Sequence, residues 1–343
     1  MTAHVLRSIP QTIGSVRTVH DIPKITEWAY DLTKQFSPTN VAGYCQMNFT
    51  PVQYAALAFT VPTHYAPEQI YIICKKSFKV LSELEPKYQT GLMMIFAKAA
   101  FLCNQEDEAL EILKTFTEVD PLIFTSPYLY LAATAKKPIA IIPPPNMHRR
   151  SFAFSLYYSG INHMMLYKYD DAFKLLIHCL HLPCQCDMIP KVVSAFSLVC
   201  FLNHYTKKQF IGVLPPKAEI DPVSMCLWDG RKIPEKNQMN YPKFYLYFWD
   251  EIVKEKVMRN IIFCSRTISR LSISKLKDLC GCFDENKLFE YMNDLMSKHR
   301  IQYVYGDDKI VTFTPAPNDI DLQEELKSVE KLLDDVKSMQ EMN

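Results

Sequence analysis

Glycine is scarce in this chain, which has only 8 glycines among 343 residues. Loops that cradle phosphate groups with their backbone need several glycines close together, so a nucleotide site of that kind is excluded. An excess of one charge is lacking as well, because 38 basic residues stand against 37 acidic ones and leave a formal net charge of +1. Such a balance gives no indication of binding to nucleic acid or to an anionic membrane.

Long uninterrupted apolar runs are also missing. The longest candidate, residues 192–202, falls short of the roughly 18 to 20 residues that a membrane-spanning helix needs. The first residues, MTAHVLRSIPQTIG, lack the apolar core of a signal peptide. The 11 scattered cysteines are odd in number. We therefore expect an intracellular protein in a reducing compartment, without a membrane partner.

The motifs of common catalytic sites are absent too. The sequence has no P-loop, no G-x-S-x-G, no H-E-x-x-H, and no His-x-His pair of the kind that JAB-type zinc isopeptidases need. The pairs Cys184-x-Cys186 and Cys280-x-Cys282 are not the C-x-x-C knuckles of a zinc ribbon. With His178 and His181 near the first pair, a metal site is one interpretation, but Cys and His on apolar helices more often belong to the core. We expect no enzyme, and hence no catalytic residue, metal, cofactor or small-molecule substrate.

Hydrophobic and aromatic residues are abundant, at 48% of the chain, with 19 tyrosines and 20 phenylalanines. Residues 90–116 predict two helices joined by a turn, and residues 152–182 predict two more. Small and aliphatic residues recur at matching positions of the two segments: Ala97 with Gly160, Ala109 with Ala172, and Leu113 with Leu176. This pattern predicts antiparallel helix pairs of tetratricopeptide type, stacked as a solenoid. Two ordinary α-hairpins of a bundle are the alternative.

The segment 261–314 has the clearest local pattern. Ser272 and Asp284 each precede a helical stretch, and their side-chain oxygens can accept the backbone N–H groups that a helix start leaves unpaired. Gly306 begins the turn of a hairpin. The expected strands are residues 267–271, 301–305 and 310–313. The order helix, strand, helix, helix, hairpin predicts a winged helix.

A winged helix suggests DNA binding, but the charges of its candidate recognition helix argue against it. The charged residues of this stretch are Asp284, Glu285, Lys287, Glu290, Asp294, Lys298 and Arg300. DNA affinity depends on clustered basic side chains that neutralise phosphates, and this mixture has no cationic excess. The hairpin turn, with Asp307 and Asp308, is acidic as well. We therefore expect no DNA partner.

Residues 319–343 predict a final helix. Its apolar positions are Leu322, Leu326, Val329, Leu333 and Val336. They are spaced by 4, 3, 4 and 3 residues, which is the seam of a coiled coil. An isolated helix of this length is marginal in water, so we expect a partner helix. A tail that folds back on its own domain is the alternative.

Helical repeats, then a winged helix, then a last helix: this order resembles the PCI family, scaffold subunits shared by the proteasome lid, the COP-9 signalosome and the translation initiation factor 3 complex. The resemblance covers roughly residues 85–343. Within the family, the signalosome members are the most similar. The segments that carry this similarity are FSLYYSG (154–160), YKYDDA (167–172), VMRNI (257–261), LSISKL (271–276) and NDID (318–321).

The resemblance implies a mainly α-helical fold, an α-solenoid of tetratricopeptide-like repeats followed by a winged helix with a small β-hairpin and a coiled-coil-type helix. It implies four regions: an N-terminal helical region (1–85), the repeats (86–240), the winged-helix part of the PCI domain (241–315) and a bundle helix (316–343). It also implies a non-catalytic scaffold in the cytoplasm and nucleus. Its partners would be other PCI subunits and MPN subunits and, indirectly, cullin-RING ligases.

The resemblance also implies two interfaces. PCI winged helices line up edge to edge, and here this would place Tyr303, Tyr305, Val311 and Phe313 at a shared strand edge. The seam of the last helix would join a bundle of helices from several subunits. Two alternatives stay open: a PCI subunit of the proteasome lid, and a PCI protein of translation initiation or mRNA export that contacts RNA.

Overall fold

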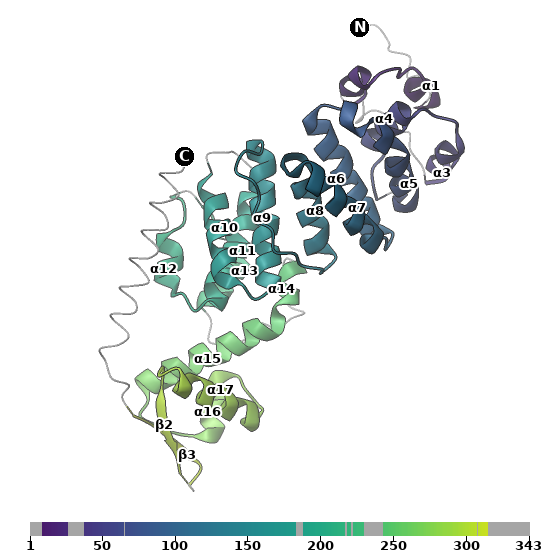
Figure 1. Ribbon diagram of the computed structural model, residues 1–343. Helices are drawn as coiled ribbons and strands as arrows, with labels where there is room; N and C mark the ends of the chain where they lie inside the picture. Colours follow the sequence, from purple (N-terminus) through teal and green to yellow (C-terminus); the bar gives the residue numbers. More distant parts are fainter. Residues whose placement is uncertain are drawn as a thin grey trace, which may run out of the picture. The chain divides into compact units, whose positions relative to one another are not determined.

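The computed structural model describes residues 9–26, 38–64, 66–182, 188–216, 218–220, 222–229, 243–306 and 308–314. Over these residues the chain is mainly α-helical with one small antiparallel sheet of three strands, which confirms the expected fold class at this coarse level. The chain divides into two compact units, Met1–Lys168 and Tyr169–Asn343 (Figure 1). The division lies inside the predicted repeat region, and the four predicted region boundaries stay predictions.

The first unit is made of helices. In chain order they are α1 (Ile9–Gly14), the 3-10 helix η1 (Val19–Asp21), α3 (Pro38–Gln46), α4 (Pro51–Thr60), α5 (Pro67–Ser77), the 3-10 helix η2 (Phe78–Glu83), α6 (Pro86–Leu102), α7 (Glu106–Val119), α8 (Pro121–Thr134) and α9 (Arg149–Met165). Several of them begin at a proline, which tolerates the first helical position because the N–H that it lacks would be unpaired there anyway. Thr50 caps α4 by accepting a hydrogen bond from the backbone N–H of Gln53.

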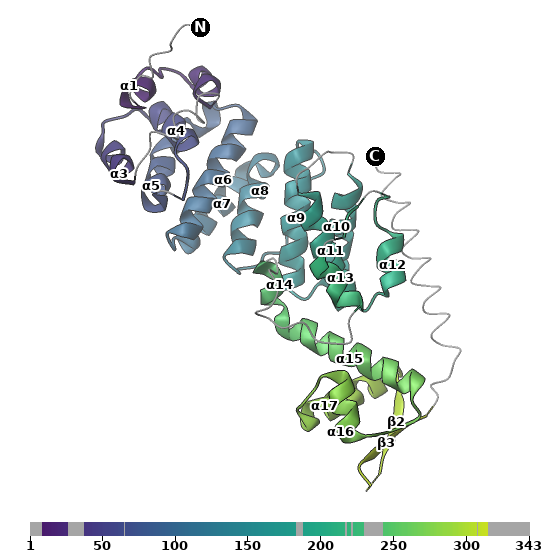
Figure 2. The same ribbon diagram turned by 180° about the vertical axis from the view of Figure 1, so that it is seen from behind.

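Helices α6, α7 and α8 pack against one another, and α9 packs on α8 (Figures 1 and 2). Ala97, Ala109 and Leu113 are fully buried where α6 and α7 meet their neighbours. The sequence had predicted helices over most of α6, α7 and α9, but it gave no helix for α8. That helix is apolar all round, so the sequence shows no helical period there. It also contains Pro127, a residue that argues against a helix interior.

The second unit combines helices with the sheet. Its elements are α10 (Tyr169–His181), α11 (Ile189–Leu202), α12 (Lys207–Gly212), α13 (Pro222–Asp229), α14 (Lys243–Tyr247), α15 (Trp249–Thr267), β1 (Arg270–Ser272), α16 (Ile273–Cys280), α17 (Glu285–Ser297), β2 (Gln302–Tyr305) and β3 (Ile310–Thr314). Helix α11, which contains the longest apolar run of the sequence, is almost wholly buried. In the aromatic stretch 243–249, Phe248 separates helix α14 from helix α15.

Both predicted helix caps in the region of the sheet are confirmed. Ser272 accepts a hydrogen bond from the backbone N–H of Lys275 at the start of α16. Asp284 accepts from the backbone N–H groups of Asn286 and Lys287 at the start of α17. Both helices then place an apolar face on a common core with α15 and the sheet. Among the described helices, none is both long enough and apolar enough to cross a membrane.

Candidate protein-interaction surface

The sheet distributes the four predicted strand-edge residues over two strands. Tyr303 and Tyr305 lie on β2, opposite Phe313 and Val311 of β3. However, β3 also pairs with β1 on its other side, so the strand order is β1-β3-β2. The predicted placement of Val311 and Phe313 at a strand edge is therefore wrong. Their side chains belong to the core, with exposed fractions of 0% and 4%.

Strand β2 is an edge of the described sheet. The pattern of its hydrogen bonds to β3 shows which of its backbone groups point away from β3. The backbone N–H of Gly306 donates to the carbonyl oxygen of Ile310, at 3.1 Å. Backbone groups of alternate residues point to opposite sides of an antiparallel strand. Val304 and Gln302 are therefore directed at β3 like Gly306, while the N–H and C=O groups of Tyr303 and Tyr305 point away from it.

Helix α17 holds the two tyrosine side chains of this edge. The Tyr303 hydroxyl donates to Oδ1 of Asn293, at 2.7 Å. The ring of Tyr305 packs edge to face on Phe289, with ring centroids 4.8 Å apart. Phe289 and Asn293 are one helical turn apart, matching the two-residue spacing of the tyrosines on β2. Burial raises the pKa of Tyr303, which keeps its hydroxyl protonated as the donor in this bond.

The other face of β2 is open. Val304 has an exposed fraction of 63%. Valine in a strand normally packs on a half-buried surface of the sheet. Three ion pairs lie in this region: Arg270 with Asp308 at 3.0 Å, Lys298 with Asp294 at 3.0 Å, and Lys277 with Glu285 at 3.9 Å. The rim of this surface is therefore mixed in sign, and its centre is a short strand edge with an exposed valine.

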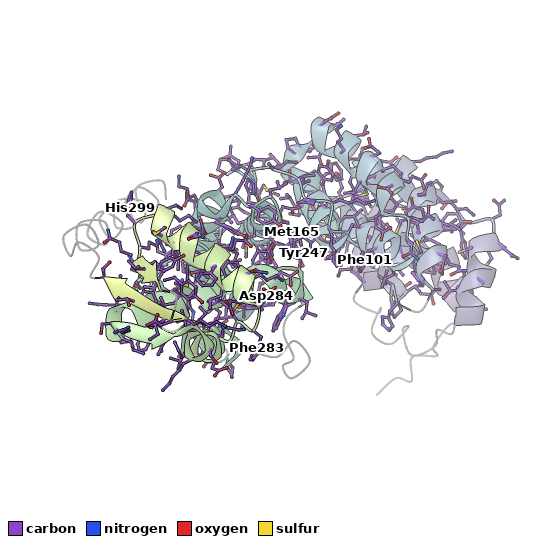
Figure 3. All side chains as sticks on the ribbon, turned by 90° about the horizontal axis from the view of Figure 1, so that it is seen from below. Phe101, Met165, Tyr247, Phe283, Asp284 and His299 are labelled. Atoms are coloured by element: carbon purple, nitrogen blue, oxygen red, sulfur yellow. The ribbon has the colours of Figure 1, made fainter. Side chains whose placement is uncertain are left out.

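A second exposed apolar side chain lies at the start of α17. Figure 3 labels Phe283 and Asp284 at this end of the helix and His299 just beyond its other end. Asp284 is the cap, and Phe283, directly before it, is largely exposed. A hydrophobic residue in this position often packs on the fourth helical residue, which is Leu288 here, yet Leu288 is fully buried and Phe283 is not. Phe283 was not singled out from the sequence.

A charged cluster with a buried glutamate and a half-buried arginine joins α15 to the end of α11 within the second unit. The Arg259 guanidinium donates from Nη2 to the carbonyl oxygens of Phe201, at 2.9 Å, and Tyr205, at 3.0 Å. Phe201 lies in the last turn of α11 and Tyr205 shortly after its end, and a cation at a helix C-terminus is favoured by the helix dipole. The guanidinium also lies over the rings of Phe201 and Trp228, 4.5 and 5.2 Å from their centroids.

The carboxylate of Glu255 balances this cation. Its Oε1 accepts from Nε of Arg259, at 2.7 Å, and its Oε2 lies 2.9 Å from Nδ1 of His204. Burial lowers the pKa of Arg259, whereas the Glu255 carboxylate opposes that shift. Next to it, Lys256 is buried and donates to the carbonyl oxygen of Leu227, at 2.9 Å. These contacts fix α15, which leads into the sheet, to α11 and α13.

The candidate metal residues do not form a described site. Cys184 and Cys186 lie outside the described residues. Nε2 of His181 lies 3.1 Å from the carbonyl oxygen of Val213, and burial lowers the pKa of His178. Over the described residues, no group of three or more His, Cys, Asp and Glu side chains is arranged to hold a metal ion.

The second C-x-C pair is part of the core. Cys280 and Cys282 are buried together with Cys264 beneath α15 and α17. A hydrogen bond with Cys264 and burial both raise the pKa of the Cys280 thiol. A thiol is reactive as its thiolate, so this environment disfavours nucleophilic chemistry at Cys280.

The five predicted seam residues of the last helix lie outside the described residues: Leu322, Leu326, Val329, Leu333 and Val336. The coiled-coil seam thus stays a prediction. Neither protein-family models nor curated protein sequences give a match to this chain. The PCI family therefore rests on the resemblance of the sequence segments quoted above.

Proposed function

We propose that this chain is a non-catalytic scaffold subunit of PCI type that joins its neighbours through the free edge of β2. The observation that carries the proposal is the pair Tyr303 and Tyr305, whose backbone N–H and C=O groups point away from β3 at the outer strand of the described sheet. A strand from a neighbouring subunit can pair with those groups, while the face holding Val304 offers apolar contact.

The arrangement of elements supports this proposal. α15, β1, α16, α17 and the hairpin of β2 and β3 follow one another in the order of a winged helix. The packed helices of the first unit, with small residues at their crossings, are typical of a helical solenoid. The predicted seam after residue 319 would supply a second contact, in a helical bundle.

The assembly that we propose is the COP-9 signalosome, with this chain in the position of its subunit 3. The quoted sequence segments support this choice over the proteasome lid. Such a subunit organises the complex that removes a ubiquitin-like modifier from cullins, whereas the metal centre for that reaction belongs to another subunit. Its partners would be other PCI subunits and MPN subunits in the cytoplasm and nucleus, with cullin-RING ligases contacted indirectly.

Affinity purification of the full chain, followed by mass spectrometry, tests the choice of complex. We expect co-purified PCI and MPN subunits together with deneddylation activity. Recovery of proteasome lid subunits without a cullin deneddylase would replace the signalosome by the lid. Tight RNA binding at physiological salt in a gel shift would instead favour the alternative of a translation or mRNA-export protein.

A matched pair of substitutions tests the strand edge. Tyr305→Pro removes an outward N–H together with the tyrosine ring, whereas Tyr305→Ala removes the ring alone. Proline is tolerated on an edge strand when its missing N–H faces away from the ladder. We expect Tyr305→Pro to reduce assembly about tenfold more than Tyr305→Ala. A tenfold difference corresponds to about 1.4 kcal/mol, which is the size expected for one lost strand-pairing hydrogen bond. Equal assembly of both variants would exclude pairing at this edge.

Deletion of residues 319–343 tests the second contact. If the predicted seam joins a bundle, the shortened chain stays folded, with unchanged hydrogen exchange in α15 and α17, but enters the complex poorly. Normal assembly of the shortened chain would remove the bundle from the proposal and leave the β2 edge as the remaining contact.

A further inference from the structure

The connection between α8 and α9 is an extended, proline-rich strap that the first unit holds in place. The strap, defined as residues 138–147, has no helix or strand, and it contains Pro143, Pro144 and Pro145 in a row. Each proline fixes its own φ near −65°, and a residue before proline is restricted to extended or polyproline II conformation. Ile142, Pro143 and Pro144 are each followed by proline, so the stretch up to the turn that begins at Pro145 favours a left-handed polyproline II conformation.

Polar side chains of α9 hold the strap by its backbone. Oδ1 of Asn162 accepts from the N–H of Ile139, at 3.1 Å, and the Ser159 hydroxyl donates to the carbonyl oxygen of Ile141. Asn162 and Ser159 are buried, and Pro143 of the strap is buried as well. These contacts order the strap without covering it, which lowers the conformational entropy that a binding partner would otherwise have to remove.

The strap, held in this way, exposes an apolar ridge to solvent. Ile142 has an exposed fraction of 75%, and Pro145 is exposed too. Because polyproline II has three residues per turn, these two residues lie on one side of the strap, about 9 Å apart. An exposed ridge of this period is what an aromatic-lined groove recognises in a proline-rich segment.

Two arginines follow the ridge at an unusual place. Arg149 and Arg150 are the first two residues of α9, both exposed, and no carboxylate among the described residues forms an ion pair with either. The helix dipole makes the N-terminus the unfavourable end for a cation. The two positive charges therefore do not stabilise α9. They form a cationic end to the ridge of Ile142 and Pro145.

We propose that the strap is a docking site for a polyproline-binding module whose aromatic groove ends in acidic side chains. Ile142 and Pro145 would enter the groove, and Arg149 and Arg150 would face the acidic end. This surface is separate from the β2 edge and does not depend on the choice of complex proposed above.

The test uses the purified full chain and a panel of recombinant SH3, WW and EVH1 modules, with affinities measured by biolayer interferometry. We expect at least one module with an acidic groove end to bind in the micromolar range. Ile142→Ala should weaken that binding at least tenfold. The matched control Val119→Ala, which changes an equally exposed aliphatic residue of α7 (79%), should leave it unchanged.

A double variant tests the cationic end. Arg149→Glu with Arg150→Glu should weaken binding at least fivefold and remove its salt dependence, while thermal unfolding stays the same or improves, because acidic residues suit a helix N-terminus. Absence of binding across the panel, or binding that survives Ile142→Ala, would overturn the proposal. So would binding to phosphatidylserine vesicles that needs the arginines and ignores Ile142→Ala.

Discussion

The two units stabilise their helix contacts with different kinds of buried polar group. Between α8 and α9 the groups are neutral: the hydroxyls of Ser126 and Ser155 lie 2.6 Å apart, and Asn162 donates to the carbonyl oxygen of Leu129. Between α11 and α15 the groups are ions, with Arg259 and Glu255 at the centre. Each set adds a side-chain donor to backbone carbonyl oxygens at the helix contact.

The difference lies in the cost of losing one member. A neutral partner that is removed leaves an unpaired dipole, whereas an ion that is removed leaves a buried opposite charge. The contact of α15 with α11 therefore tolerates substitution less than the contact of α9 with α8. In the second unit, this sensitive contact holds α15, the helix that leads into the sheet.

The largest expected effect is at the charged contact. Arg259→Ala leaves the buried Glu255 carboxylate with His204 as its remaining partner and removes the Nη2 donor from the carbonyl oxygens of Phe201 and Tyr205. Because the Arg259 side chain is 26% exposed, we expect a loss of about 3 kcal/mol in the stability of the second unit, the low end for breaking a buried ion pair. Hydrogen exchange followed by mass spectrometry measures it in peptides from α11 and α15. Arg270→Ala, which breaks an exposed ion pair with Asp308, is the control and should cost less than about 1 kcal/mol. Equal costs for the two variants would remove the distinction between the units.

The neutral contact should give a smaller effect. Asn162→Ala leaves the N–H of Ile139 without its partner and removes the side-chain donor to the carbonyl oxygen of Leu129, and we expect a loss of about 1–3 kcal/mol in the first unit. Urea unfolding, read by exchange in α8 and α9 peptides, measures it. Thr115→Ala, at an exposed hydroxyl of α7, should change stability very little. A cost at Asn162 as large as that at Arg259 would contradict the proposed ranking.

Helix caps sharpen the comparison further. Asp284→Ala removes the acceptor for two backbone N–H groups at the start of α17 and should cost about 1 kcal/mol in the second unit. In the first unit, α6 begins after Glu85, whose side chain makes no cap bond, so Glu85→Ala should have a clearly smaller effect. Chemical unfolding of both variants measures the difference, and a larger loss for Glu85→Ala would be the contrary result.

The smallest effect concerns an exposed contact between α5 and α7. Hydrogen bonds from Lys75 and from Tyr71 lower the pKa of Glu108, although the carboxylate is largely exposed. A carboxyl group whose folded-state pKa is depressed stabilises the fold above its unfolded-state pKa and loses that contribution as pH falls through its folded-state pKa. Glu108→Gln should thus cost less than about 1 kcal/mol at neutral pH and nothing at pH about 2. Urea unfolding at both pH values checks the sign, and a pH-independent difference would contradict it.

Local features of the second unit were predictable because neighbours in the sequence decide them. Ser272 and Asp284 cap the helices that follow them, and Gly306 begins the turn between β2 and β3, as expected from residue type and spacing alone. Helix α8 was not predicted because it has apolar residues on all its faces and therefore no helical period in its sequence. Phe283 gave no signal either, because exposure depends on what packs nearby.

The strand edge shows where sequence patterns fail. Tyr303 and Val311 both lie in alternating aromatic and β-branched stretches, and both looked equally suited to an edge. Pairing of β1 with β3 decides the matter, because it places Val311 in the middle of the sheet and leaves Tyr303 at its border. That pairing joins residues distant in the chain, so no local pattern contains it.

By itself, the sequence of this protein determined the helical character, the caps and the hairpin, since period and hydrogen-bond chemistry act over a few residues. Only the tertiary structure decided which strand is free, that Arg259 reaches the end of α11, and that Asn162 holds the strap while Ile142 stays outside. These are contacts between distant segments. They depend on which surfaces burial brings together, which residue type alone does not specify.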